Sequence, residues 1–177
     1  MDINKRNIRL LGLLGFGFTS LLGAALHFLY GMTGSTAAAL FSSVNESTWE
    51  HMKLLFFPML LFAVIQRFIM NGMDGGYWCV KLAGTVLGLL LIQVLFYTLT
   101  GIFGTLPDWV NIAIFFASSA AAYIYETRRF ISGGKCRYET AAIFAFALIA
   151  AAFWLFTFLP PEIPLFQDPL TGLYGIA

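Results

Sequence analysis

Residues 140–159 read TAAIFAFALIAAAFWLFTFL, twenty positions without one charged side chain. An α-helix needs about 20 predominantly apolar residues to cross the hydrocarbon core of a bilayer, so this stretch predicts a membrane-spanning helix. The rest of the chain agrees, because only 11% of its 177 residues are charged and its mean hydropathy is +0.81. A soluble domain carries about 25% charged residues. The sequence therefore predicts an all-α integral membrane protein.

Four more apolar runs precede this one, and glycine or proline interrupts the pattern between several of them. Five helices with short loops fill nearly the whole length, which predicts a single transmembrane domain over residues 1–177 with a tail at 160–177. The expected spans are a bundle of five transmembrane helices at residues 8–30, 48–70, 78–100, 109–125 and 140–159.

The Lys and Arg residues set the expected orientation, because they concentrate on the inner side of a membrane. An inside N-terminus places nine of the ten basic residues inside and leaves only Lys53 outside. The C-terminus is then outside. Cys79 and Cys136 would both lie inside, where a structural disulfide is not expected. The net charge of +1 gives no reason to expect nucleic acid as a partner.

Small residues recur every four positions on three of the predicted helices, and such stripes let membrane helices approach closely. Such stripes favour close packing of helices within one bundle, and they equally favour packing between copies of the chain in a homo-oligomer in the lipid bilayer. The stripes are Gly15, Thr19 and Gly23, continued by His27; Gly84 and Gly88; and Ala113, Ala117 and Ala121.

The stretch NESTWEHMK at residues 45–53 contains two carboxylates, an imidazole and an ammonium within nine residues, at the start of one predicted helix. Ser47 and Glu50 have the spacing of a capping box, in which each satisfies a backbone N–H of the first turn. On this structural interpretation Glu50 only caps the helix, Glu46 faces water and Trp49 anchors the membrane interface.

The functional interpretation brings these groups together in one pocket that faces outward. If the helix already includes Glu46, then Glu46, Glu50 and Lys53 share a face, and His27 lies at similar depth. The apolar tail is expected to fold over the outer face, with a turn at Asp168. The candidate catalytic residues are His27, Glu46, Glu50 and His51, and the candidate binding residues are Trp49, Lys53, Asp168 and Tyr174.

A divalent metal ion is one candidate cofactor, held by Glu46, Glu50 and His27. Lys53 on the carboxylate face argues against a bare metal site, since it would neutralise one carboxylate and repel the ion. An acid/base site in which His27 or Glu50 takes a proton fits the same residues. His51 is rotated by about 100° from Glu50 along a helix, so these two need not meet the same ligand.

The motifs NESTWEHMK at residues 45–53 and DPLTGLYG at residues 168–175 resemble the signatures of a family of small bacterial membrane proteins of unknown function. The resemblance covers most of the chain and implies a multi-pass protein of the bacterial cytoplasmic membrane. It implies no activity or cofactor.

Three functions remain open from the sequence. The first is a membrane-embedded hydrolase or transferase acting on a lipid or another membrane-borne substrate. The second is a small transporter, channel or ligand-binding subunit for an ion or polar solute, and the third is an accessory subunit that docks a partner protein. Transport usually needs polar groups near the bilayer midplane, where the expected spans carry no charge. This absence favours the enzyme.

Overall fold

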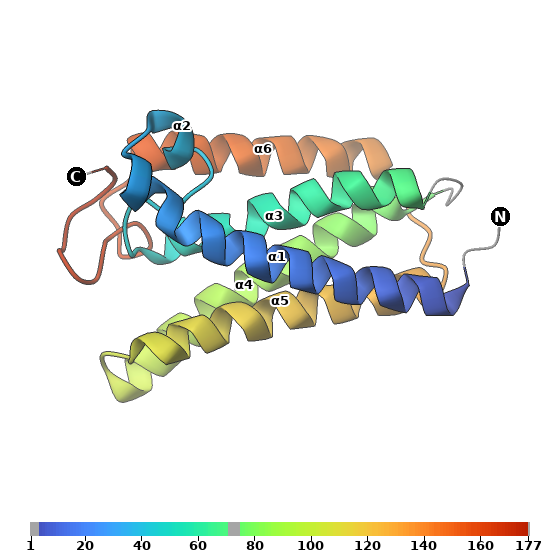
Figure 1. Ribbon diagram of the computed structural model, residues 1–177, viewed down its shortest axis with the longest axis horizontal. Coiled ribbons are helices and arrows are strands. Elements are labelled where there is room, and N and C mark those ends of the chain that lie inside the picture. The colour runs from blue at the N-terminus through green and yellow to red at the C-terminus, as the bar shows by residue number, and fades with distance from the viewer. Residues whose placement is uncertain (1–3, 71–74, 177) are drawn as a thin grey trace.

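The computed structural model describes residues 4–70 and 75–176. These residues form five long helices and one short helix, which confirms the predicted all-α class. Each long helix runs opposite to the preceding long one along a common axis (Figure 1). The helices are α1 (Lys5–Thr33), α2 (Thr36–Ala39), α3 (Thr48–Ile69), α4 (Tyr77–Phe103), α5 (Asp108–Ile131) and α6 (Glu139–Phe158).

Within the described residues, four helices are long and apolar enough to cross a membrane: α1, α3, α4 and α6. The remaining long helix, α5, carries Asp108, Glu126, Arg128 and Arg129. It also continues to Ile131, beyond the predicted span, because hydropathy marks only the apolar part of a helix whereas backbone hydrogen bonding continues into polar residues. The structure is consistent with a multi-pass membrane protein, and a fifth crossing stays a prediction.

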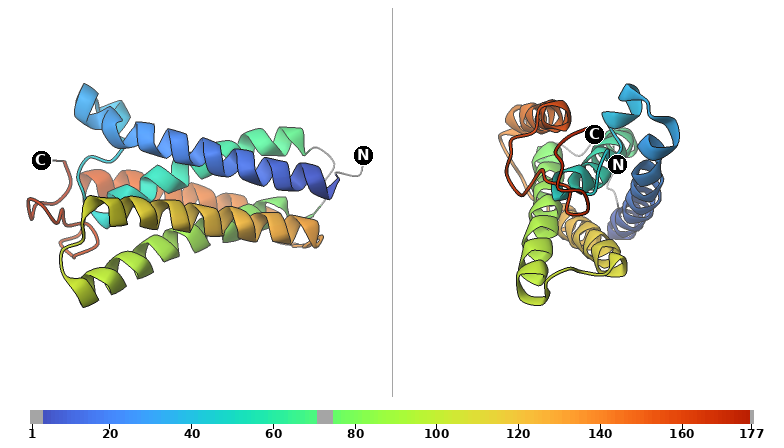
Figure 2. Two further views of the ribbon diagram at one scale, coloured as in Figure 1. Left: turned by 60° about the horizontal axis from the view of Figure 1, so that its bottom comes forward. Right: turned by 90° about the vertical axis from the view of Figure 1, so that its left-hand side faces the viewer.

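Helix α3 is the most buried of the four apolar helices. It contacts α1, α4 and α6, while α5 contacts α1 and α4 and completes a ring of four helices. Helix α6 lies outside this ring, against α3 and α4 (Figure 2). Buried side chains of α3, including Leu55, Phe56 and Met59, share one apolar core with Leu89 of α4 and Phe153 of α6.

Two of the predicted small-residue faces pack within the chain. A Cβ atom on Gly23 would lie 2.7 Å from the Leu54 carbonyl oxygen and 2.7 Å from the Phe115 ring. A Cβ atom on Gly84 would overlap the Glu126 side chain. The missing side chains therefore let α1 approach α3 and α5, and let α4 approach α5. The alanine stripe of α5 is largely exposed, and the homo-oligomer stays a prediction.

The loops gather at two ends of the bundle. We call one the tail end, where residues 34–47, residues 104–107 and the tail at 159–176 meet (Figure 1). The tail folds over this end: the Asn45 side-chain amide donates to the Gly175 carbonyl at 2.9 Å, and the Trp49 backbone N–H donates to the Leu165 carbonyl at 3.1 Å. The other, the basic end, holds the start of α1 and the loop at 132–138.

Cys79 and Cys136 form a disulfide at the basic end, so the expectation that these cysteines stay unpaired is wrong. They are 57 residues apart in the sequence and meet because the first turn of α4 lies beside the loop before α6. The Glu139 carboxylate strengthens the same junction, since it accepts the backbone N–H groups of Gly76 and Trp78 and so caps α4.

Candidate functional site

Helix α3 begins at Thr48, and Ser47 is its N-cap. The Ser47 hydroxyl accepts the Glu50 backbone N–H at 3.3 Å, as predicted. The return half of the capping box is absent, because the Ser47 N–H donates to the Asn45 side chain at 2.9 Å instead. Glu46 precedes the helix, so the expectation that it shares a helical face with Glu50 and Lys53 is wrong.

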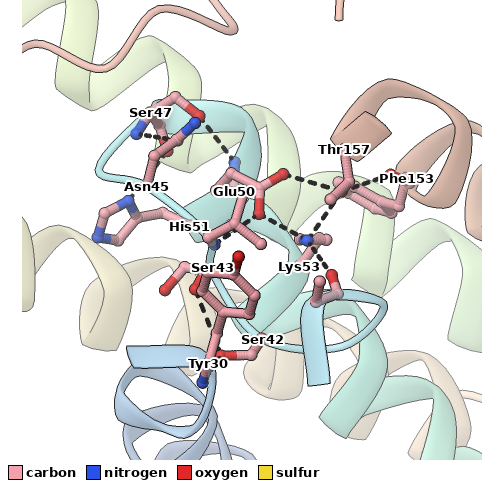
Figure 3. Close-up of polar contacts among 12 residues, drawn as sticks. Tyr30, Ser42, Ser43, Asn45, Ser47, Glu50, His51, Lys53, Phe153 and Thr157 are labelled. Carbon is pink, nitrogen blue, oxygen red and sulfur yellow. Dashed lines mark hydrogen bonds and ion pairs between the residues drawn. The ribbon is translucent and has the colours of Figure 1, made fainter. Parts of the chain in front are cut away.

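Glu50 and Lys53 form a buried group with Thr157 of α6, which we call the closed cluster (Figure 3). The Lys53 ammonium lies 2.6 Å from the Glu50 carboxylate and donates to the Ala39 carbonyl and the Thr157 hydroxyl, each at 2.8 Å. Its three N–H bonds therefore all have partners. Glu50 also accepts the Val44 backbone N–H at 3.0 Å.

The closed cluster joins α2, α3, α6 and the segment before α3. Glu50 is 2% exposed and Lys53 is 0% exposed, and neither lines the cavity described below. A buried ion pair that saturates its own hydrogen bonds has no open position for a ligand. The predicted convergence of these two residues with His27 on one pocket is therefore wrong.

His27, Glu46 and His51 form a second group, which we call the open cluster. His51 Nε2 lies 3.4 Å from one Glu46 oxygen and His27 Nε2 lies 3.9 Å from the other. All three side chains are partly exposed, with 42% of the Glu46 side chain accessible. Figure 3 shows the His51 ring turned away from the Glu50 carboxylate, as expected for adjacent positions on a helix. The open cluster combines two predicted catalytic residues of the motif with His27 of α1.

Both imidazoles are held through Nδ1. The Nδ1 atom of His51 lies 3.0 Å from the Ser47 carbonyl, which can only accept, so Nδ1 carries a proton and, in the neutral ring, Nε2 presents a lone pair. The Ser43 hydroxyl lies 3.3 Å from the His27 carbonyl and 3.2 Å from His27 Nδ1. When this hydroxyl donates to the carbonyl, it accepts from Nδ1. The Nε2 lone pairs of both rings then face Glu46.

The segment that carries Ser43 is bound tightly to α1. The Ser42 hydroxyl donates to the Leu26 carbonyl and accepts the Tyr30 N–H at 3.0 Å. These groups have the i→i−4 spacing that pairs along a helix. The two contacts fix this segment against the last turns of α1 and so hold Glu46 near His27.

A cavity of about 500 Å³ opens beside the open cluster, between α1, α3, α5 and the tail. His27, Glu46 and His51 line one part of it, and Phe115 and Leu170 line another. Its α1 and α5 walls include side chains that are exposed on the outside of the bundle, such as Phe28 at 63% and Ile112 at 57%. A smaller cavity of about 150 Å³ adjoins it and shares several of its residues.

Asp108 and Asn111, at the start of α5, line both cavities. The side-chain amide oxygen of Asn111 (Oδ1) is buried without a hydrogen-bond partner among the described residues. Neither residue was among the site residues predicted from the sequence. Their spacing of three places them on one helical face, and this polar pair at the start of the fourth predicted span is the sequence signal that could have found them.

The four predicted binding residues lie outside the cavity. Lys53 belongs to the closed cluster, and Trp49 packs against Phe166 of the tail. The Asp168 carboxylate accepts the Leu170 N–H at 2.8 Å and the Thr171 hydroxyl at 3.0 Å, which confirms the predicted turn but leaves this group occupied. Tyr174 pairs with Gln167 across that turn. These groups shape the tail, and Leu170 is the tail residue that lines the cavity.

A second buried ion pair lies toward the basic end, where Lys81 Nζ of α4 lies 2.5 Å from the Glu126 carboxylate of α5. Lys81 is one of the nine basic residues expected on the inner side, and its side chain is 1% exposed, inside the bundle. Its ammonium also lies 5.3 Å from the centre of the Tyr123 ring. Glu126 was not anticipated as its partner.

Comparison with known proteins assigns the chain to a family but gives it no activity. No curated protein matches it, and no solved structure matches it. The family model that matches covers residues 3–176, which is nearly the entire chain. That model is described as a family of unknown function. The chain with the open cluster at its tail end therefore belongs to this family of unknown function, DUF6512.

Proposed function

We propose that this protein is a membrane-embedded hydrolase or transferase acting on a lipid or another membrane-borne substrate, with the open cluster as its active site. In this proposal α5 is the fifth membrane crossing. Its 24 residues extend about 36 Å at 1.5 Å per residue, which is enough for a hydrocarbon core of about 30 Å.

The main observation that supports this proposal is the cavity beside the open cluster. One part of its wall is polar and the other is apolar, and Phe28 and Ile112 belong both to that wall and to the exterior of the bundle. An amphiphilic substrate has a polar headgroup and apolar chains that match these two parts of the wall. Its chains would lie along α1 and α5 while its headgroup reaches Glu46 and His51.

The same cluster contains groups suited to proton transfer. In its neutral form His51 presents a lone pair on Nε2 beside the Glu46 carboxylate, and an imidazole can accept a proton at such a position. In hydrolysis, a water molecule would attack the ester carbon or phosphorus and lose a proton to this pair. The departing oxygen would then receive the proton. Asn111 and Asp108 line the same cavity and would offer further polar contacts to a headgroup.

Vesicles test the proposal directly. Purified protein would be reconstituted with phosphatidylethanolamine, phosphatidylglycerol and cardiolipin, and lipid products would be followed by mass spectrometry. We expect product from the native protein and a loss of at least about 100-fold for Glu46→Gln, the usual scale for removing an acid/base group. Glu162→Gln, at an exposed tail carboxylate, is the control. Unchanged lipids with the native protein, or equal turnover by Glu46→Gln, would reject this function.

We propose the orientation from the basic residues, with the basic end inside and the open cluster at the outer leaflet. The Cys79–Cys136 disulfide lies at that basic end, and disulfides persist mainly in oxidising compartments. The basic residues therefore favour placing this end inside the cell, whereas the disulfide favours placing it outside. A cysteine placed at Gly172, in a chain without the two native cysteines, should react with an impermeant reagent from outside the cell. Labelling only after the membrane is opened would reverse the orientation.

The second candidate function is a transporter or binding subunit for an ion or polar solute. Lys81 and Glu126 favour it, since ionisable groups buried inside a membrane bundle often mark a solute path. One Glu126 oxygen has no hydrogen-bond partner among the described residues. Uptake into vesicles that is abolished by Glu126→Gln and unaffected by Glu46→Gln would favour this candidate over the enzyme.

A further inference from the structure

We propose that the open cluster is a binding site for a divalent metal ion of the zinc type, held by His27 Nε2, His51 Nε2 and a Glu46 oxygen. The ion would be the cofactor of the proposed active site. Its chemical role rests on the proposed function, but its binding does not.

The distances fit such an ion. One ligand atom from each of the three side chains can be chosen so that all lie within 4.8 Å of one another. In a tetrahedral site with bonds of about 2.0–2.2 Å, ligand atoms lie about 3.2–3.6 Å apart. The His51 and His27 Nε2 atoms lie 3.4 and 3.9 Å from the Glu46 carboxylate, each from a different one of its two oxygens. Small side-chain movements would therefore close the three ligands around one ion.

The hydrogen bonds of both imidazoles match those of metal ligands. A histidine that binds a metal almost always donates its other ring N–H to a carbonyl, carboxylate or water, which fixes the tautomer and the ring plane. His51 does so to the Ser47 carbonyl, and His27 Nδ1 contacts the Ser43 hydroxyl. Two independent segments thus direct two Nε2 lone pairs to the same carboxylate.

The structure also removes the objection drawn from Lys53. Its ammonium is bound to Glu50, Ala39 and Thr157, so it does not neutralise Glu46. Glu50 is excluded from the ligand set for the same reason. The remaining set of two histidines and one glutamate is the type that catalytic zinc sites use, with the fourth position left to water or substrate. Here that position would face the 500 Å³ cavity.

Charge balance supports a divalent ion. Two neutral imidazoles and one carboxylate give the ligand set a charge of about −1, so a divalent ion with a bound hydroxide makes the site neutral overall. A neutral site suits a cavity whose wall is largely apolar. Bound water on zinc ionises near pH 7, which would supply the attacking hydroxide for the proposed hydrolysis. With the ion bound, His51 and Glu46 would act as its ligands, and this ionisation would replace proton transfer to that pair.

Metal analysis of the purified protein tests the site. The protein would be stripped with a chelator in detergent, given Zn²⁺ or Co²⁺, dialysed and measured for bound metal and for the Co²⁺ absorption spectrum. We expect about one ion per chain, and at least a 100-fold weaker affinity for Glu46→Gln, His27→Gln and His51→Gln, since each removes a direct ligand. Glu162→Gln should bind like the native protein.

His51→Cys separates lost ligation from lost folding. A thiolate is also a zinc ligand, so this variant should regain tight binding and add a sulfur-to-cobalt charge-transfer band. Native protein that holds no more Zn²⁺ than Glu46→Gln would overturn the site, as would binding that survives all three Gln substitutions. Metal binding without lipid turnover would retain the site and reject the enzyme. Turnover that a chelator leaves unchanged, with no bound metal, would reject only the metal.

Discussion

Glu46 and Glu50 are four residues apart at the start of α3, but the fold gives them opposite surroundings. Glu50 lies in the first turn, where an ammonium, a hydroxyl and a backbone N–H contact its carboxylate. Glu46 lies just before the helix, where two imidazoles approach its carboxylate beside a cavity. The difference shows that a cluster of charges in the sequence can divide into a structural part and a part available to ligands.

The largest expected effect tests whether the closed cluster is structural. Glu50→Gln leaves the Lys53 ammonium buried without its counter-charge, which should lower the free energy of unfolding by about 3–5 kcal/mol. Glu46→Gln, at a partly exposed position, should change it by no more than about 0.5 kcal/mol. Titration with SDS in mixed micelles would measure both. The comparison fails if Glu46→Gln proves the more destabilising.

The next effect tests how α1 positions the open cluster. Gly23→Ala places a Cβ atom 2.7 Å from the Leu54 carbonyl and should cost about 1–3 kcal/mol of unfolding free energy. His27 lies one turn further along α1, so the Zn²⁺ affinity should fall as well. Gly17→Ala is the matched control, because its Cβ would meet no atom of the described residues within 4 Å. Equal behaviour of the two variants would show that close packing at Gly23 does not position His27.

The smallest effect concerns the hydrogen bond to His27. Ser43→Ala removes the hydroxyl near His27 Nδ1, and loss of such a support typically weakens metal binding by about 10–100-fold. Ser132→Ala, at an exposed position of the basic end, should leave the affinity unchanged. Zn²⁺ titration against a competing chelator would measure both variants. An unaltered affinity for Ser43→Ala would show that this contact does not orient the ring.

Local chemistry makes several features of this protein predictable from its sequence. Four predicted spans correspond to helices of membrane-spanning length and hydropathy, Ser47 caps α3, and Asp168 forms the expected turn. Each depends on neighbouring residues in the chain: apolar run length, a side-chain oxygen at a helix start, or an Asp-Pro pair. The Cys79–Cys136 disulfide was not predictable in this way, because it joins segments that are distant in the sequence.

The sequence by itself determined that this is an all-helical, strongly apolar chain with one cluster of ionisable groups near the start of α3. Only the tertiary structure decided which of those groups meet. Starting α3 at Thr48 rather than before Glu46 separates the two carboxylates, and the close approach of α1 at Gly23 brings His27 to His51. Helical periodicity assigns a residue to a face, but the partner of that face depends on how whole helices pack. That packing is a property of contacts distant in sequence.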